Sequence, residues 1–288
     1  MSTLTQQEEH AKPISYAQPA GQCHFWLRRL HSLAGIMFGG YIVVHLVVNA
    51  TGLWPRVYQQ NVDKIHQMEP MLPVIEILAI FGPLLLHLLY GLYVASVGVS
   101  YPTTTRYSYG GNLRYLLQRI TSFILIVFVV YHIGMLHKWG FALVGLKKAP
   151  DFNAVNLAYQ TTVGSIKAPF EGMPVANAAV ITLYLLGIWS AAFHFANGLW
   201  TAAITWGLTV TRTAQQRWGK VCCGLGIFLM LVGTVAWYAF AIAGNPQLDE
   251  SKTETQVMMS VDGKDYMVPV QAPEKGMADP APAATPAK

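Results

Sequence analysis

The apolar positions of the chain come in five long blocks, separated by shorter segments that hold most of the charged residues. Each block is long enough to cross a bilayer, which takes about 20 residues in a helix. Backbone groups in lipid must satisfy their hydrogen bonds within the segment, so uninterrupted apolar runs of this length predict α-helices. We therefore predict an all-α integral membrane protein, a bundle of five transmembrane helices. The blocks lie near residues 30–50, 73–99, 116–140, 175–209 and 221–244.

The same pattern divides the chain into three parts. Residues 1–29 form a polar leader, residues 30–244 form the membrane domain, and residues 245–288 form a tail that is first charged and then rich in alanine and proline. The tail's composition cannot bury a core, which predicts disorder. The first apolar block follows a long leader and lacks a small-residue cleavage site at its end, so we expect no cleavable signal peptide.

Composition supports a membrane protein. Of 288 residues, 53% are hydrophobic and 11% are charged, against about 25% charged in an average soluble domain. Cys23, Cys222 and Cys223 are too few for a disulfide framework, and the chain has no CxxCH motif for covalent haem attachment. The net charge of +5 is not gathered in a soluble basic domain, so we expect no nucleic-acid partner.

Lysine and arginine predict the orientation, because they concentrate in cytoplasmic loops. The leader and the second and fourth loops are basic, and those two loops contain no acidic residue. The first and third loops mix both signs. We predict a multi-pass protein of the cytoplasmic membrane with its amino terminus in the cytoplasm and its carboxyl terminus outside. The basic residues of the cytoplasmic side are Lys12, Arg28, Arg29, Arg106, Arg114, Arg119, Arg212, Arg217 and Lys220.

Four of the nine histidines lie deep in the apolar blocks, one on each of the first four: His45, His87, His132 and His194. A polar side chain inside a membrane helix is costly and by default marks a functional site. A single such histidine can equally be hydrogen-bonded to a neighbouring helix, but four in succession favour a shared function. Imidazoles that face inward from neighbouring helices can bind haem iron from both sides of the porphyrin.

Depth in the membrane predicts which histidines pair. At about 1.5 Å of rise per residue, His45 and His132 lie ~22 Å and ~24 Å from the cytoplasmic starts of their helices, which places both in the outer half. His194 lies on a helix that enters from outside and belongs to the inner half, and His87, near the middle of its helix, remains as its partner. We therefore expect two haems, one stacked above the other.

Other polar residues have candidate roles around these haems. His31 precedes His45 by 14 residues on nearly the same helix face, and we expect it near a haem propionate, or in a purely structural contact. Arginine suits bidentate contact with carboxylates, so some of the basic residues at the cytoplasmic edge are candidates for propionate binding, although orientation alone also requires positive charge there. These candidates are Arg28, Arg29, Arg114 and Arg119.

The second apolar block contains two further features. Glu76 lies in the outer turn, eleven residues before His87, at the level expected for the outer haem. It can relay a proton to a quinone there, or it can be an interfacial carboxylate that faces water. Pro83 frees the carbonyl of Ala79 and predicts a kink in this helix.

Several sequence runs occur in an order that resembles a known family. The chain is similar to the di-haem cytochrome b membrane anchor of succinate:menaquinone oxidoreductase, the single-subunit, Bacillus-like type. The resemblance covers roughly residues 24–244 and does not explain the leader, the long third loop or the tail. The runs are RRLHS (28–32), HLVVN (45–49), LLLHLLYGLY (84–93), LQRIT (117–121), FHFANGLW (193–200) and TWGLTVT (205–211).

The resemblance implies a five-helix anchor in which His45 with His132, and His87 with His194, bind two b haems. It further implies that a flavoprotein subunit and an iron–sulfur subunit dock on the cytoplasmic face. Succinate is oxidised by those partners, so this chain has no catalytic residue of its own for that step, and electrons pass through it to menaquinone. Some di-haem fumarate reductase anchors carry a glutamate where this chain has Ala192, which favours succinate oxidation here.

Three alternatives are open at this point. One is a di-haem cytochrome b of another respiratory complex, such as a hydrogenase or formate dehydrogenase, but those often place two ligands on one helix. A second is a fumarate reductase anchor that runs in reverse. The third is a transporter or channel with a histidine proton relay, which needs polar residues spread along the helices. Apart from the histidines and Glu76, the helices carry mainly serine, threonine and asparagine.

Overall fold

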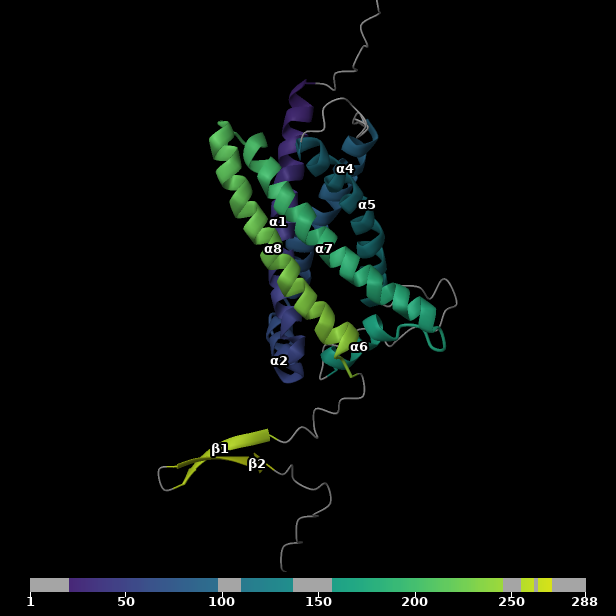
Figure 1. Ribbon diagram of the computed structural model, residues 1–288, viewed down its shortest axis with the longest axis vertical. Helices are drawn as coiled ribbons and strands as arrows, with labels where there is room; N and C mark the ends of the chain where they lie inside the picture. Colours follow the sequence, from purple (N-terminus) through teal and green to yellow (C-terminus); the bar gives the residue numbers. More distant parts are fainter. Residues whose placement is uncertain (1–20, 98–109, 137–156, 246–254, 262–263, 271–288) are drawn as a thin grey trace, which may run out of the picture.

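The computed structural model describes residues 21–97, 110–136, 157–245, 255–261 and 264–270. Within these residues, long helices run side by side as a bundle (Figure 1). Five helical segments are long and apolar enough to cross a membrane, as predicted. They are Phe25–Leu53, Leu72–Ser96, Leu113–Met135, Pro174–Thr205 and Arg212–Ile242.

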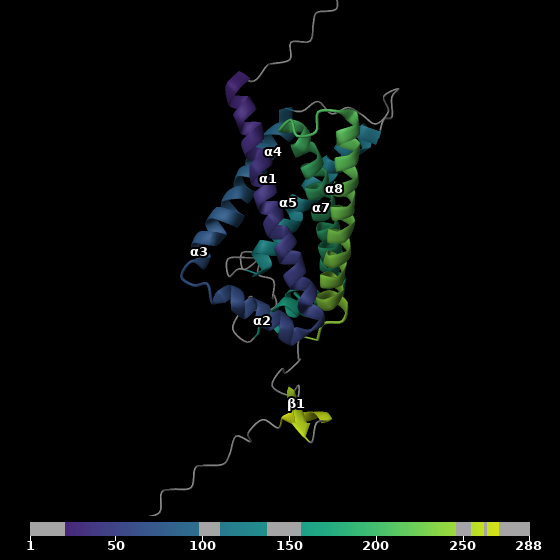
Figure 2. The same ribbon diagram turned by 90° about the vertical axis from the view of Figure 1, so that its left-hand side faces the viewer.

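The first two spans differ in regularity. The first is α1 (Gly21–Ala50), which ends in a 3₁₀ turn, η1 (Thr51–Leu53). The second combines α3 (Leu72–Ile75), a π-helical turn η2 (Glu76–Phe81) and α4 (Gly82–Val97), and Figure 2 shows α3 and α4 along the same span. The Gly82 N–H donates to the Ile77 carbonyl, five residues back. The irregularity therefore lies immediately before Pro83, because proline cannot donate the next backbone bond.

The remaining spans are α5 (Gly110–Leu136), α7 (Pro174–Thr205) and α8 (Arg212–Trp237), which a π-helical turn η4 (Tyr238–Ile242) extends. Helix α7 packs against α1, α5 and α8. The Thr211 hydroxyl caps α8 by accepting from the Ala214 N–H at 3.2 Å, as expected of an N-cap threonine. The central position of α7 brings its side chains into contact with three other spans.

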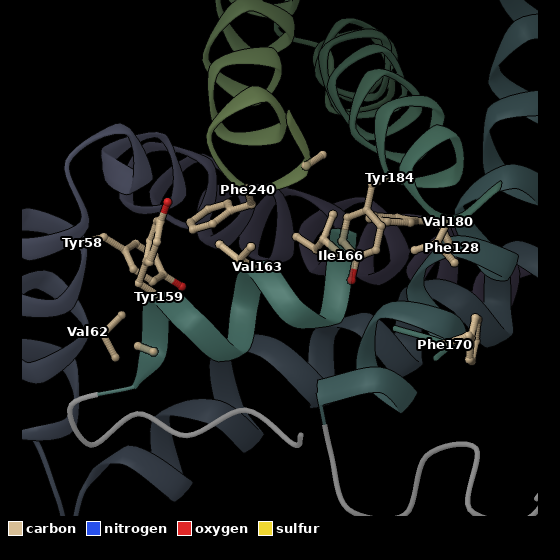
Figure 3. Packing of buried hydrophobic residues seen from close by; sticks show 12 residues of the cluster. Tyr58, Val62, Phe128, Tyr159, Val163, Ile166, Phe170, Val180, Tyr184 and Phe240 are labelled. Atoms are coloured by element: carbon tan, nitrogen blue, oxygen red, sulfur yellow. The ribbon is translucent and has the colours of Figure 1, made fainter. Parts of the chain in front are cut away.

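Two short helices cover one end of the bundle (Figure 1): α2 (Pro55–His66) and α6 (Ala158–Lys167). We call this the α6 end and the opposite end, where Arg29 lies, the Arg29 end. Neither short helix follows from the apolar pattern, because each spans few residues and mixes polar with apolar positions. Together with side chains of α5, α7 and η4 they form the larger of two clusters of buried hydrophobic side chains (Figure 3).

The outward-facing side chains of the spans are strongly apolar. Val44, Leu89, Val127 and Leu231 expose between 59% and 63% of their surfaces. A soluble monomer rarely exposes apolar surface on this scale, whereas lipid covers it without cost. The chain is a multi-pass membrane protein.

The tail contains a short hairpin. Strands β1 (Thr255–Val261) and β2 (Lys264–Val270) pair antiparallel, with Thr255 opposite Val270 and Val261 opposite Lys264. The segment expected to be disordered therefore includes a stretch with paired backbone. The other tail residues, and leader residues 1–20, lie outside the described part of the chain.

Candidate functional site: two histidine pairs within the bundle

The four deep histidines lie in two pairs, one above the other. His45 on α1 and His132 on α5 have ring centroids 5.8 Å apart, with ring planes at 82°. His87 on α4 and His194 on α7 have centroids 6.0 Å apart, with planes at 81°. These are the pairs expected from depth. Haem binding by these rings remains a prediction.

The ring separations fit a metal ion held between two imidazoles. Two metal–nitrogen bonds of about 2 Å, plus about 1 Å from each nitrogen to its ring centre, separate the centroids by ~6 Å. In the described part of the chain, no group of three or more histidine, cysteine, aspartate or glutamate side chains could hold a metal ion. Each pair thus offers two imidazoles at a separation that suits one metal ion between them.

The Nδ1 atoms of the pair nearer the α6 end contact tyrosine hydroxyls. The His45 Nδ1 lies 3.2 Å from the hydroxyl of Tyr41, one helical turn earlier on α1. The His132 Nδ1 lies 3.3 Å from the hydroxyl of Tyr184 on α7. A metal-binding histidine usually engages its second ring nitrogen in this way, which fixes the tautomer and the ring orientation.

The pair nearer the Arg29 end uses different oxygens. The His87 Nδ1 lies 3.1 Å from the backbone carbonyl of His31, and the His194 Nδ1 lies 3.4 Å from the Thr121 hydroxyl. A carbonyl can only accept, so the His87 Nδ1 carries the proton and its Nε2 carries the lone pair. In all four histidines it is Nδ1 that meets an oxygen, so Nε2 is the nitrogen suited to a metal.

An amide pair ties α5 to α7 beside His194. The Gln118 side chain donates to the His194 carbonyl at 3.2 Å, and the buried Asn197 donates to the Gln118 side-chain oxygen at 2.8 Å. Gln118 and Asn197 belong to the sequence runs that carry the family resemblance, but the sequence alone gives no sign that they support His194. The contacts show that they hold the backbone that carries His194.

His31 packs directly on His87. The two rings are stacked with centroids 3.9 Å apart and an interplanar angle of 11°, and the His31 Nδ1 is buried with no hydrogen-bond partner among the described residues. Gly35 makes room for this arrangement, because a Cβ there would lie 2.6 Å from the His87 ring. Gly91 faces His31, and a Cβ at this position would lie 3.3 Å from the His31 ring. The structure thus places His31 against a candidate ligand, and its predicted propionate contact stays a prediction.

The arginines at the Arg29 end contact aromatic rings and carbonyls. The Arg29 guanidinium lies 3.6 Å from the centroid of the Phe25 ring and donates to the Thr205 carbonyl at 3.4 Å. The guanidinium of Arg114 lies 4.7 Å from the Trp200 ring centroid. Arg119 donates to the Ala95 carbonyl at 2.5 Å and to the Tyr115 hydroxyl at 2.9 Å, while Arg28 is exposed. Their expected contact with haem propionates stays a prediction.

Glu76 lies at the first position of the π-helical turn η2 and is half-buried. This turn packs against α1, and the Glu76 carboxylate is within electrostatic range of the Tyr41 hydroxyl. Since that hydroxyl contacts the His45 Nδ1, the only acidic residue of the second span lies on the side of the His45–His132 pair.

Comparison with known proteins identifies a relative of this chain. No family model matches the chain. The succinate dehydrogenase cytochrome b558 subunit of Bacillus subtilis (strain 168) is 32% identical over 224 residues, which cover 77% of this chain and 99% of that protein. Nearly the whole relative is therefore aligned, while about a quarter of this chain lies outside the alignment. With this identity and coverage, and with five membrane-spanning helices, the chain belongs to the family of succinate dehydrogenase cytochrome b subunits.

Proposed function

We propose that this chain anchors a succinate dehydrogenase in the membrane and conducts electrons from its iron–sulfur subunit to a quinone through two b haems. The observation that carries the proposal is the pair of neighbouring imidazoles at each of two depths, with ring separations of 5.8 Å and 6.0 Å. The name of the Bacillus subtilis relative, a cytochrome b558 subunit of succinate dehydrogenase, supports both the haem and the complex.

His45 and His132 would hold one haem, and His87 and His194 the other. Each bound haem supplies a one-electron iron couple. The protein's part is to orient the four imidazoles through their Nδ1 contacts, which also raises ligand basicity, and to exclude water with the surrounding helices. Succinate oxidation in the flavoprotein releases two electrons and two protons, and quinone reduction consumes the same numbers, so this chain needs no group that oxidises succinate.

We place the Arg29 end in the cytoplasm, where the flavoprotein and iron–sulfur subunits would dock. The basic leader and the basic second and fourth loops support this orientation. The His87–His194 pair is then the inner site and the His45–His132 pair the outer site. The buried Ala192, two residues before His194, offers no acidic side chain for a proton path beside the inner site, which supports succinate oxidation as the direction of flow.

Menaquinone would be reduced beside the outer pair, with Glu76 as the proton relay. The half-buried position of Glu76 near Tyr41 supports this assignment. Electrons would then cross outward while protons come from the outer phase. Succinate is a poor reductant for menaquinone, and a charge that moves with the field gains ~2.3 kcal/mol per 100 mV. The membrane potential can therefore supply the missing drive.

The test is purification of the complex in detergent, followed by a haem count and a reduced-minus-oxidised spectrum. We expect two b haems per chain, together with a flavoprotein and an iron–sulfur subunit, and reduction of both haems by succinate. A single haem, or none, would refute the two-site proposal. Two haems without a flavoprotein partner would instead indicate a cytochrome b of another respiratory complex.

A further inference from the structure

Helix α6 is far more buried than its place in a loop suggests. It belongs to the long segment between α5 and α7 that the family runs leave unexplained, yet Ala158, Val163 and Ser165 have no exposed surface. A connecting segment normally lies on the surface and interacts with water. The burial of α6 therefore indicates a role in closing this end of the bundle.

The buried face of α6 lies directly under the residues that support the outer site. Figure 3 shows Val163 next to Phe240 and Ile166 next to Tyr184, within one apolar cluster. Tyr184 is the residue whose hydroxyl lies 3.3 Å from the His132 Nδ1. Tyr184 therefore joins the apolar cluster that contains α6 to the His45–His132 pair.

Both ends of α6 are fastened to other helices. At its carboxyl end, the Lys167 ammonium donates to the carbonyls of Ile242 and Gly244 at 2.9 Å and 2.8 Å. These carbonyls lie at the end of the last span, where helix carbonyls lack intrahelical partners and attract a cation. Gly244 lies so close that a Cβ there would meet Val163 at 2.8 Å.

At the amino end of α6, α2 supplies the partners. The Gln59 side-chain oxygen accepts from the Ala158 N–H at 2.9 Å, which satisfies one of the unpaired donors of the first turn. The Tyr58 hydroxyl lies 3.2 Å from the Thr162 hydroxyl. Burial raises the pKa of the Tyr58 phenol, which keeps the group neutral and able to remain in this interface.

We propose that α6 is a plug that shields the outer haem site from water, and that Lys167 and Gln59 are the residues that position it. The inference rests on the proposed function, because it assigns α6 to the site formed by His45 and His132. Access of water stabilises the charged ferric state of a haem over the ferrous state. The hydrophobic shell around a metal therefore sets its potential, and loosening α6 should lower the potential of one haem alone.

The test uses the whole complex with the variants Lys167→Ala, Gln59→Ala and their combination. Lys64→Ala is the matched control, since Lys64 is an exposed lysine on α2, and Lys167→Arg is a conservative variant that keeps the donors. Hydrogen exchange of the α6 amides reports whether the helix is loosened. Potentiometric titration of the b-haem spectrum reports the two potentials separately.

We expect the combined variant to exchange its α6 amides roughly tenfold faster, as the loss of charge-assisted hydrogen bonds predicts. In the combined variant we also expect one of the two haem potentials to fall. Lys64→Ala and Lys167→Arg should keep the wild-type exchange rate and both wild-type haem potentials. Unchanged exchange in the combined variant would overturn the assignment of Lys167 and Gln59. Faster exchange with both potentials unaltered, or with both lowered equally, would overturn the shielding role.

These outcomes are separate from failure of the proposed function. A wild-type complex with fewer than two b haems would refute the proposed function, whereas the exchange experiment would still decide how α6 is held.

Discussion

Replacement of Gly35 by alanine tests the link between helix packing and the inner haem site. A Cβ at this position would lie 2.6 Å from Cε1 and 2.7 Å from Nδ1 of His87. Ordinary carbon contacts are about 3.5–4.0 Å, so α1 and α4 must separate by roughly 1 Å or the imidazole must turn. Overpacking of this kind costs about 1–3 kcal/mol, and either response breaks the contact between the His87 Nδ1 and the His31 carbonyl.

The matched control is Gly40→Ala on the same helix, because a Cβ there meets no atom of the described residues within 4 Å. Both substitutions gain the helix propensity of alanine over glycine, about 1 kcal/mol, so their difference isolates the clash. We expect Gly35→Ala to lose or shift one b haem in the reduced-minus-oxidised spectrum, with a lower thermal midpoint than Gly40→Ala. If Gly35→Ala keeps two haems with wild-type potentials and the stability of Gly40→Ala, the inferred contact with His87 does not matter.

Four further predictions concern the site. The variants His132→Ala and His194→Ala should each lose one b haem and keep the other, which pigment analysis measures. Retention of both haems in both variants would contradict the ligand assignment. Tyr184→Phe removes the hydroxyl beside the His132 Nδ1, so the basicity of this ligand should fall and the potential of one haem should rise in a redox titration. Tyr238 is exposed, so the control variant Tyr238→Phe should leave both haem potentials unchanged. Glu76→Gln should slow succinate-driven quinone reduction by roughly 10²–10⁴-fold, the usual contribution of a proton-transfer group, with both haems retained. An uncoupler that collapses the membrane potential should slow the wild-type reaction in vesicles. An unchanged rate in either experiment would argue against the outer proton route.

The membrane domain and the histidine pairs could be read from the sequence for simple reasons. An apolar run of about 20 residues has one acceptable conformation in lipid, so the number and approximate limits of the spans follow from local composition. A straight helix with a fixed rise per residue converts sequence position into depth, which is why His45 and His132 could be matched before their side chains were placed. Pro83 marked the irregular turn of the second span because proline lacks a backbone donor.

The details that shape the site depend instead on contacts between residues far apart in the chain. Periodicity does not reveal that His31 stacks on His87, that Gln118 and Asn197 tie α5 to α7, or that Tyr184 supports His132, since each contact joins different helices whose rotation and separation are set by packing. Helix α6 is the extreme case. Ten residues of mixed polarity are a weak local signal, and their burial is produced by α2, α7 and η4. One-dimensional patterns specified which segments cross the membrane, and only the packed bundle decided which side chains meet.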